Sequence, residues 1–366
     1  MIIKKAYNEA KIFTEKLDAG SEGLIGAFCD SPLSAGSRIR IMPDVHAGKG
    51  CVIGTTKTVS DKIAPGLIGV DIGCGISAIK VSGKRLEMQK LDKLIYEKIP
   101  SGRKIRTVPH RFADQSDLER LHCLRHVQKD NALCSIGTLG GGNHFIEIDR
   151  ATNGNHWLII HSGSRRLGVE VATYYHELAF QTKTENISYE FAYLTGDLMA
   201  DYIADLSIVQ EFARLNRMAI ADEICKGMKL SVEESFECVH NYYDAEAKIL
   251  RKGAISAKEN EPVIIPMNMR DGCLIGLGKG NPDWNCSAPH GAGRLMSRQD
   301  ARNSFTLSQF KKEMQGIYST SVSRNTLDES PMAYKPIEDI LSKIEDTVAV
   351  RERILPVYNF KASEED

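Results

Sequence analysis

The stretch GVDIGCGI, residues 69–76, places Asp71 and Cys74 three residues apart among three glycines. It lies inside the longer apolar segment LIGVDIGCGISAIKV, residues 67–81. Glycine loses much conformational entropy on folding, so it collects where a turn or a close ligand approach requires it. Two interpretations are open. In one, a tight turn follows a buried strand and Cys74 fills space. In the other, Asp71 and Cys74 form half of a metal site.

Similar apolar, β-branched segments bounded by glycine recur along the chain and are typical of buried strands. They alternate with charged segments of helical period. This alternation predicts a single large mixed α/β domain over residues 1–366. The expected strands lie in residues 38–56, 67–81, 156–165, 261–268 and 272–281, and the expected helices in residues 85–98, 114–128, 167–182 and 307–316.

The longest segment of helical period covers about residues 186–250. We expect two or three helices there, with a break near CKGMKLSVEES, residues 225–235. Ser231 followed by Glu234 matches a capping box, which predicts that a helix carries residues 236–250. Because strands are expected on both sides, this segment is interpreted as a helical insertion.

Composition limits the class of protein. Of the 366 residues, 42% are hydrophobic and 26% charged, which are ordinary globular values and enough to bury a core without disulfides. Nine scattered cysteines without a CxxC pair argue against a disulfide framework or a zinc ribbon and suit a reduced, cytoplasmic protein. The first residues lack the apolar core of a signal peptide, and no apolar run reaches transmembrane length, so we expect no membrane association.

The net charge of −1 excludes a strongly electropositive nucleic-acid binder, but positive charge is concentrated locally. Residues 101–111 hold Arg103 and Arg106 without an acid, and SRRLG, residues 164–168, holds Arg165. Residues 294–302 form a third basic cluster. Each cluster is either a solvated face or an anion site beside a glycine-rich turn, and RNA phosphates are one candidate ligand.

Five of the ten histidines are candidate ligands or catalytic groups, and four of them lie close to glycines. His144 follows a glycine-rich turn, His161 ends an expected strand, and His240 lies on the expected helix. His46 and His290 lie in MPDVHAGKG and CSAPHGAGR. Strand ends are where a rigid scaffold presents functional groups. Four further histidines lie on expected helical faces or in polar loops and are interpreted as structural or solvated, namely His122, His126, His156 and His176.

Thiolate, imidazole and carboxylate together suit a divalent transition ion. Zn²⁺, Mn²⁺, Fe²⁺ and Co²⁺ remain open on ligand chemistry alone, while Mg²⁺ prefers oxygen ligands. Ligands this dispersed fit a catalytic site with open positions better than a structural clip.

The motifs also match a known family in order and in spacing. MPDVHAGKG (42–50), GVDIGCG (69–75), GTLGGGNHFIE (137–147), HSGSRRLG (161–168), HN (240–241), GKGN (278–281) and HGAGR (290–294) resemble those of the RtcB family of GTP-dependent RNA ligases. The resemblance covers about residues 40–361. It implies a mixed α/β domain of the RtcB type, with strands packed around a metal-binding cleft that holds two Mn²⁺ ions and a histidine that becomes guanylated.

The resemblance assigns a role to each matching position. Cys74 is similar to the thiolate that bridges the two metals, and His290 to the nucleophile that takes GMP from GTP. The other implied metal ligands are Asp71, His144, His161 and His240. The implied nucleotide contacts are Asn143, Glu147, Asn241, Asn268, Gly291, Ala292, Gly293, Tyr334 and Lys361. The implied RNA contacts are Arg103, Arg106 and Arg165.

The implied reaction joins an RNA 2′,3′-cyclic phosphate or 3′-phosphate end to a 5′-hydroxyl end. Two rivals are a metal-dependent phosphoesterase that only opens cyclic phosphates and a non-catalytic RNA-binding factor. The phosphoesterase would have no use for His290, Tyr334 or Lys361, and the binding factor predicts loss of ligands that are present.

One segment departs from the family pattern. In IPMNMRDGC, residues 265–273, Asn268 and Cys273 stand where hydroxyl residues are expected near the nucleotide. Arg270 and Asp271 add charge to the same turn. The nucleotide pocket, and not the metal site, is therefore where this chain is expected to differ.

Overall fold

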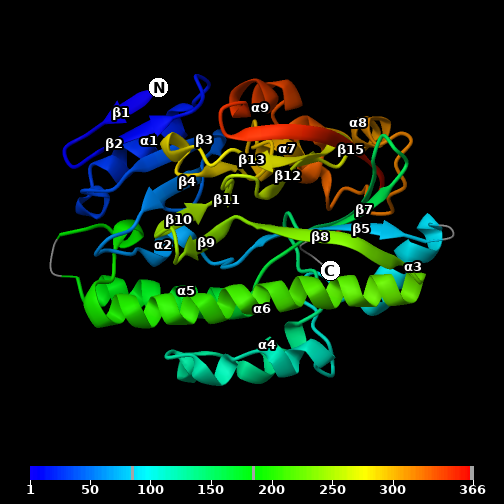
Figure 1. The fold of residues 1–366 in the computed structure, drawn as a ribbon, viewed down its shortest axis with the longest axis horizontal. Coiled ribbons are helices and arrows are strands. Elements are labelled where there is room, and N and C mark those ends of the chain that lie inside the picture. Colours follow the sequence, from blue (N-terminus) through cyan, green and yellow to red (C-terminus); the bar gives the residue numbers. More distant parts are fainter. Residues whose placement is uncertain (84–85, 184–185, 363–366) are drawn as a thin grey trace.

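Two large β-sheets dominate the computed structural model, which describes residues 1–83, 86–183 and 186–362 (Figure 1). The six-stranded sheet has the order β1-β2-β3-β4-β10-β9, and only the β2–β3 pair is parallel. Its strands are β1 (Ile2–Lys4), β2 (Glu9–Ile12), β3 (Ile39–His46), β4 (Ile53–Thr58), β10 (Ile249–Lys252) and β9 (Asn241–Asp244). This mixed α/β architecture confirms the predicted fold class.

The seven-stranded sheet has the order β12-β13-β15-β6-β7-β5-β8 and is antiparallel throughout. Its strands are β12 (Pro262–Asn268), β13 (Gly272–Gly278), β15 (Val348–Lys361), β6 (Phe145–Arg150), β7 (His156–Ser162), β5 (Gly75–Ser82) and β8 (Ser231–Val239). A two-stranded sheet pairs β11 (Ala254–Ser256) with β14 (Ser287–Pro289). Each predicted strand segment contains a strand, but in residues 67–81 the strand begins only at Gly75, after a short helix that ends at Ile68 and a turn.

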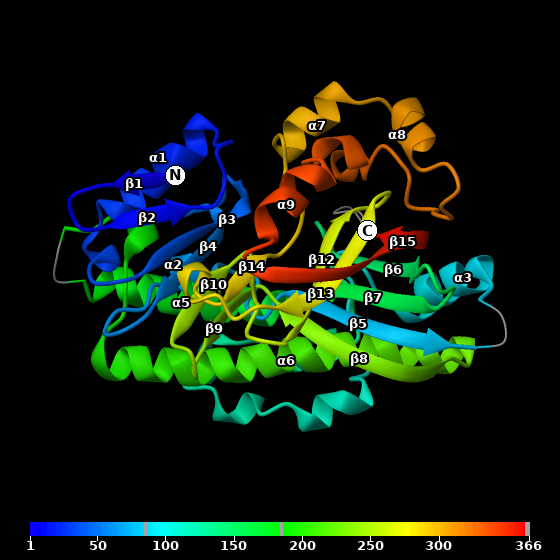
Figure 2. The same cartoon turned by 45° about the horizontal axis from the view of Figure 1, so that its top comes forward.

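The helices cover the sheets from two sides (Figure 2). The long helix α6 lies on one side of the seven-stranded sheet, and α7, α8 and α9 lie on the other, while α5 lies beside α6 at the end of the six-stranded sheet. The helices are α1 (Ala19–Cys29), α2 (Pro65–Ile68), α3 (Met88–Lys98), α4 (Lys129–Ser135), α5 (Arg165–Gln181), α6 (Gly196–Met228), α7 (Arg298–Ser304), α8 (Leu307–Glu313) and α9 (Ile337–Ile344). Within the described part of the chain, none of the helices has both the length and the apolar character that crossing a bilayer requires.

Strand alternation separates an apolar face of the seven-stranded sheet from a functional face. Ile146, Ile148 and Ile160 share a buried cluster with Ile220 and Ile224 of α6. The alternate positions of β6 and β7, which include Glu147 and His161, face the other way. The side chains of Glu147 and His161, which can take part in binding or catalysis, therefore point away from α6.

Three predicted helices correspond to α3, α5 and α8, although residue 85, the predicted start of the first, lies outside the described residues. The helix predicted over residues 114–128 is wrong, because short 3₁₀ turns occupy that segment. The buried carboxylate of Asp205 accepts the backbone N–H groups of His122 and Cys123 at 2.8 and 3.0 Å. These tertiary hydrogen bonds take the place of the backbone hydrogen bonds that a helix would form there.

The predicted helix over residues 236–250, with its capping box at Ser231 and Glu234, is also wrong. The helix α6 is continuous and ends at Met228, where Lys229 adopts a left-handed conformation with φ 55°. The next residues form β8, an edge strand that pairs with β5, and then β9 and β10. The edge strand is largely exposed and rich in glutamate, so its sequence lacks the apolar alternation that marks a buried strand. The helical part of the predicted insertion is thus confined to α6.

Candidate active site

The sheet register brings four predicted metal ligands to one place. Gly75, the first residue of β5, lies opposite Ser162 at the end of β7 and Val239 at the end of β8. Phe145, the first residue of β6, lies opposite His161. The residues next to these positions are Cys74, His144 and His240, so strand ends from three distant parts of the chain meet around His161. His240 directly follows β8, the edge strand that was predicted as a helix. This strand therefore positions one of the predicted ligands.

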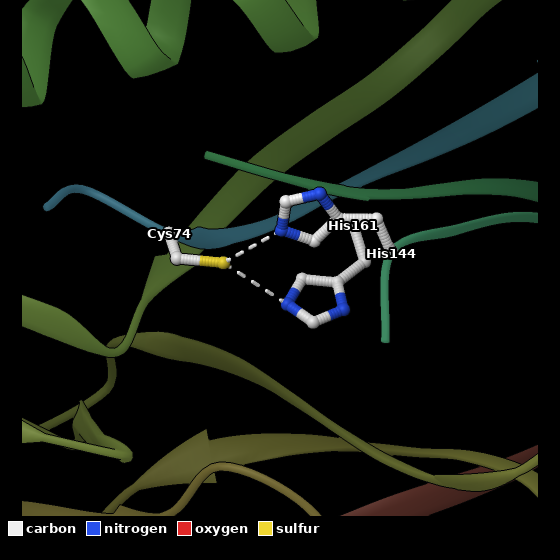
Figure 3. Close-up of side chains that lie close together, drawn as sticks. All are labelled: Cys74, His144 and His161. Atoms are coloured by element: carbon white, nitrogen blue, oxygen red, sulfur yellow. Dashed lines mark hydrogen bonds between the residues drawn. The ribbon is translucent and has the colours of Figure 1, made fainter. Parts of the chain in front are cut away.

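Cys74 lies at the centre of the cluster (Figure 3). Its Sγ is 3.4 Å from Nε2 of His144 and 3.3 Å from Nε2 of His161, and both ring nitrogens point toward the sulfur. Nε2 of His161 is also 3.4 Å from Nε2 of His240. The carboxylate of Asp71 completes the group, with Oδ2 3.0 Å from Nε2 of His144. The structure therefore places all five predicted metal ligands in one cluster.

The backbone of the opening stretch makes this approach feasible. Cys74 donates its backbone N–H to the carbonyl of Asp71 at 3.2 Å, which closes a turn before β5. Gly73 has φ +72°, and a Cβ there would lie 2.9 Å from Ala213 on α6. A Cβ on Gly163 would lie 2.1 Å from Oδ1 of Asp71. Both sites therefore require glycine, and the turn precedes a strand rather than following one.

The donor atoms converge as metal ligands do. Nδ1 of His144 contacts the Leu139 carbonyl at 2.9 Å, and Nδ1 of His161 contacts that of Asn143 at 3.1 Å. With the hydrogen on Nδ1 in both rings, Nε2 of His144 presents a lone pair to the thiol and the Asp71 carboxylate, and Nε2 of His161 presents one to the thiol and to His240. Burial lowers the pKa of His161 and of His240 well below the ordinary value, so both rings are neutral. Lone pairs this close call for a shared cation, and the mixed donor set fits a divalent transition ion.

Burial and the neighbouring Asp71 carboxylate raise the pKa of the Cys74 thiol well above its usual value. A bound divalent cation would reverse this preference, because metal binding requires the thiolate. The cluster therefore suits a state in which a bound cation supplies positive charge.

His290 lies beside this cluster but is held by a separate residue. Its Nδ1 is 2.7 Å from Oδ2 of Asp44, and its backbone N–H donates to the same oxygen at 3.2 Å. Asp44 is completely buried in β3. In the described part of the chain Nε2 makes no hydrogen bond, and the ring centroid is 4.8 Å from that of His240. The geometry leaves Nε2 available beside the metal cluster.

A cleft of about 950 Å³ connects the cluster to the C-terminal strand. His290, Asp71, Cys74, His161 and His240 line it. Every residue that the sequence assigned to nucleotide contact also lines it, namely Asn143, Glu147, Asn241, Asn268, Gly291, Ala292, Gly293, Tyr334 and Lys361. The volume suits a nucleotide-sized ligand.

A family model described as tRNA-splicing ligase RtcB matches residues 34–362. The chain belongs to the RtcB family. It is 30% identical over 355 residues to RNA-splicing ligase RtcB1 of Escherichia coli strain ATCC 25922, a match that covers 85% of this chain and 87% of the relative. RNA-splicing ligase RtcB of strain K12 is 31% identical over 356 residues with the same shares. The tRNA-splicing ligase RtcB of Aeropyrum pernix is 26% identical over 397 residues, covering 82% of each chain.

At the far end of the cleft, this RtcB chain buries an acid that sequence reasoning missed. Glu329 is 2% exposed, forms an ion pair with Lys361, and accepts a hydrogen bond from the Tyr334 hydroxyl at 2.7 Å. Burial alone would raise its pKa, but Lys361, Arg298 and Arg294 lower it to about 2. Glu329 therefore stays ionised and fixes the positions of Tyr334 and Lys361.

Two residues that sequence reasoning did not assign thus support the site. Asp44 lies in MPDVHAGKG, a motif of the family resemblance that assigns no role to this residue, and its only local signal is an aspartate near a glycine-rich turn. Glu329 lies in an acidic loop without such a signal. The partners of both residues are distant in sequence.

Arg103, Arg106 and Arg165 are not part of the cleft lining, whereas Arg294 and Arg298 of the third basic cluster line it. Arg165 donates from Nη2 to the carbonyl of Gly102 at 2.8 Å, and Gly102 in turn donates to Gly140 at 3.0 Å. These bonds tie the segment of Arg103 to the glycine-rich turn that precedes His144. Nη2 of Arg106 donates a hydrogen bond to Oε1 of Glu223 on α6 at 3.0 Å. Arg103 is exposed.

The segment that departs from the RtcB pattern, residues 265–273, carries no net charge. Asn268 accepts the backbone N–H groups of Arg270 and Asp271 at 3.0 and 2.9 Å. The Arg270 guanidinium pairs with Asp271 and Glu313. The added charges therefore compensate one another at the turn between β12 and β13.

Proposed function

We propose that this protein is an RNA ligase that joins a 2′,3′-cyclic phosphate or 3′-phosphate end to a 5′-hydroxyl end, with GTP as co-substrate and two Mn²⁺ ions as cofactors. Family membership supports RNA ligation. The observation that carries the finer proposal is the pair of His290 and Asp44 beside the cluster of Cys74, His144, His161 and His240. A phosphoesterase would have no use for a separately oriented histidine.

The first step of the proposed reaction can be assigned to individual residues of the site. Nε2 of His290 attacks the α-phosphorus of GTP, a nitrogen–phosphorus bond forms, and pyrophosphate leaves. The Asp44 carboxylate holds the Nδ1 proton and stabilises the positive charge that develops on the ring. When bound, Mn²⁺ supplies Lewis-acid stabilisation of the phosphate charge.

The later steps return the histidine to its starting state. An RNA 3′-phosphate oxygen attacks the phosphorus of the histidine–GMP, and the nitrogen–phosphorus bond breaks. The RNA 5′-hydroxyl then attacks the activated 3′-phosphate, and GMP leaves as the strand is sealed. A cyclic phosphate end must first be opened by water to give the 3′-phosphate.

The direct test uses Mn²⁺ and GTP labelled at the α-phosphate. A ligase of this kind forms a labelled protein whose bond is acid-labile and joins an RNA pair with 3′-phosphate and 5′-hydroxyl ends. Opening of cyclic phosphates without labelling or joining would instead establish the phosphoesterase alternative. RNA binding without either reaction would establish the non-catalytic alternative.

Arg103, Arg106 and Arg165 are proposed to contact RNA phosphates near the ends that are joined. The hydrogen bonds that tie Gly102 to Gly140 and Arg165 support a position beside the cleft. For Arg103→Ala, we expect the slope of log affinity against log salt to decrease by about 0.7, the value for one contact with single-stranded RNA. Self-guanylation should change much less.

A salt series of RNA affinities measures this slope. Lys93→Ala, which removes an exposed charge on α3, is the matched control. Arg106→Ala should also lower thermal stability, because it leaves Glu223 without this partner. An unchanged slope and affinity for Arg103→Ala would mean that residues 101–111 are only a solvated face.

A further inference from the structure

A second buried group of titratable side chains lies behind the nucleotide end of the cleft. Glu147 and Asp149 are two residues apart on β6, so they project from the same face of the sheet. Cys273 reaches them from β13. One side-chain atom of each residue lies within 4.8 Å of the others, and the three residues are at most 2% exposed. Two carboxyl groups and a thiol are therefore enclosed together.

The two carboxyl groups have different surroundings. Glu147 accepts a hydrogen bond from Nδ2 of Asn359 and a long one, 3.9 Å, from the Cys273 thiol, and Lys361 is the nearby positive charge. Neither oxygen of Asp149 has a hydrogen-bond partner in the described part of the chain. An ionised carboxylate without a donor is very unfavourable in a buried site. Asp149 must therefore hold either a proton or a cation.

The position of Asp149 favours a proton. Glu147 and Asn359 line the cleft, whereas Asp149 and Cys273 are not part of its lining. A cation would have to pass between Glu147 and Asn359, whose side chains are hydrogen-bonded to each other. Burial and the carboxyl groups of Asp149 and Glu147 raise the pKa of the Cys273 thiol well above its usual value, so without a cation the thiol keeps its hydrogen and acts as a donor.

We propose that Asp149 is protonated and donates its hydrogen to Glu147, which keeps Glu147 ionised as the acceptor for N–H groups of the nucleotide base. Asp149 is thus a positioning residue for base recognition, since it acts through Glu147. The inference rests on the proposed use of GTP, because guanine offers adjacent N–H donors to a carboxylate.

The electrostatics agree with this arrangement. Burial and the adjacent Glu147 raise the pKa of Asp149 well above its usual value. Burial also raises the pKa of Glu147, to about 7, although Asp149, Asn359, Lys361 and Cys273 oppose the shift. Asp149 therefore holds its proton more strongly than Glu147 does. As the pH falls through about 7, Glu147 takes up a proton and GTP affinity should weaken, by up to about tenfold per pH unit.

Two variants of the Mn²⁺-loaded full chain test the proposal. Infrared difference spectra at about pH 8 should show the carbonyl band of a protonated carboxylic acid in the unmodified protein and its loss in Asp149→Asn. The asparagine amide can still donate to Glu147, whereas Asp149→Val removes the donor. At neutral pH, calorimetry should show GTP affinity about tenfold weaker for Asp149→Val, with Asp149→Asn nearer to the unmodified protein.

Three outcomes overturn the proposal. The first is the absence of a protonated carboxyl band that depends on Asp149. The second is a metal ion that is lost on Asp149→Asn while the Cys74 cluster stays loaded, because it would make the group a cation site. The third is equal GTP affinity for all three proteins. If the unmodified protein bound no GTP, the proposed function and the role in base recognition would fail together, and the infrared band would still decide where the proton lies.

Discussion

His290→Ala should abolish the attachment of GMP to the protein and the joining of RNA 3′-phosphate ends, with a loss of roughly 10³-fold or more. Among the described residues, Nε2 of His290 has no hydrogen-bond partner and lies beside the proposed metal ligands, and alanine removes it. Because His290 is separate from the proposed ligand set, metal content should not change. The measurements are protein labelling from α-labelled GTP, strand joining, and metal analysis of the same preparation.

The control is an RNA supplied with a guanylated 3′ end. Its sealing needs the 5′-hydroxyl attack alone and should survive in His290→Ala. Asp44→Asn tests the orientation of the ring, because the amide cannot stabilise the charge on His290. We expect labelling to slow by about 10²- to 10⁴-fold, as when the carboxylate of a catalytic triad is replaced. A labelled intermediate in His290→Ala would show that another residue is the nucleophile.

The strands that carry most of the site could be predicted because both faces of the central sheet are covered. Residues 157–160 of β7 are all apolar and buried, because their side chains pack alternately into hydrophobic clusters on the two faces of the sheet. The strand β8 could not be predicted in this way. It has one neighbour in the sheet and an exposed outer edge, so its sequence is charged and resembles a helix. Pairing with β5 overrides that local preference.

Some residues of the site could likewise be predicted from the sequence, and others could not. Strand ends beside glycines suggested His144 and His161, and the family resemblance supplied the complete ligand set. The role of Asp44 could not be found from the sequence, because its partner His290 lies 246 residues away and only the packing of β14 against β3 brings them together. Asp149 looked like an ordinary polar residue near the end of a strand. Its burial is set by β13 and β15, which are far away in the chain.

Cys74→Ala should weaken metal binding by about 10²-fold or more and abolish self-guanylation. The sulfur of Cys74 contacts the ring nitrogens of both His144 and His161, so its loss removes a donor shared by the cluster. Three imidazoles and the Asp71 carboxylate remain, so the site loses one of its two donors that can carry negative charge. Metal analysis after dialysis measures the first effect, and labelling with GTP measures the second.

A spectroscopic probe separates loss of a ligand from loss of fold. Protein loaded with Co²⁺ should show a thiolate-to-metal charge-transfer band that disappears in Cys74→Ala and persists in Cys134→Ala, a matched change at a cysteine of α4 outside the cluster. Cys74 is 2% exposed, but it loses only one atom in this change, so the variant should stay folded. Retention of the band and of the metal in Cys74→Ala would show that the thiol fills space. Asp71 and the histidines would then hold the metal without it, and the glycines around Cys74 would serve the turn alone.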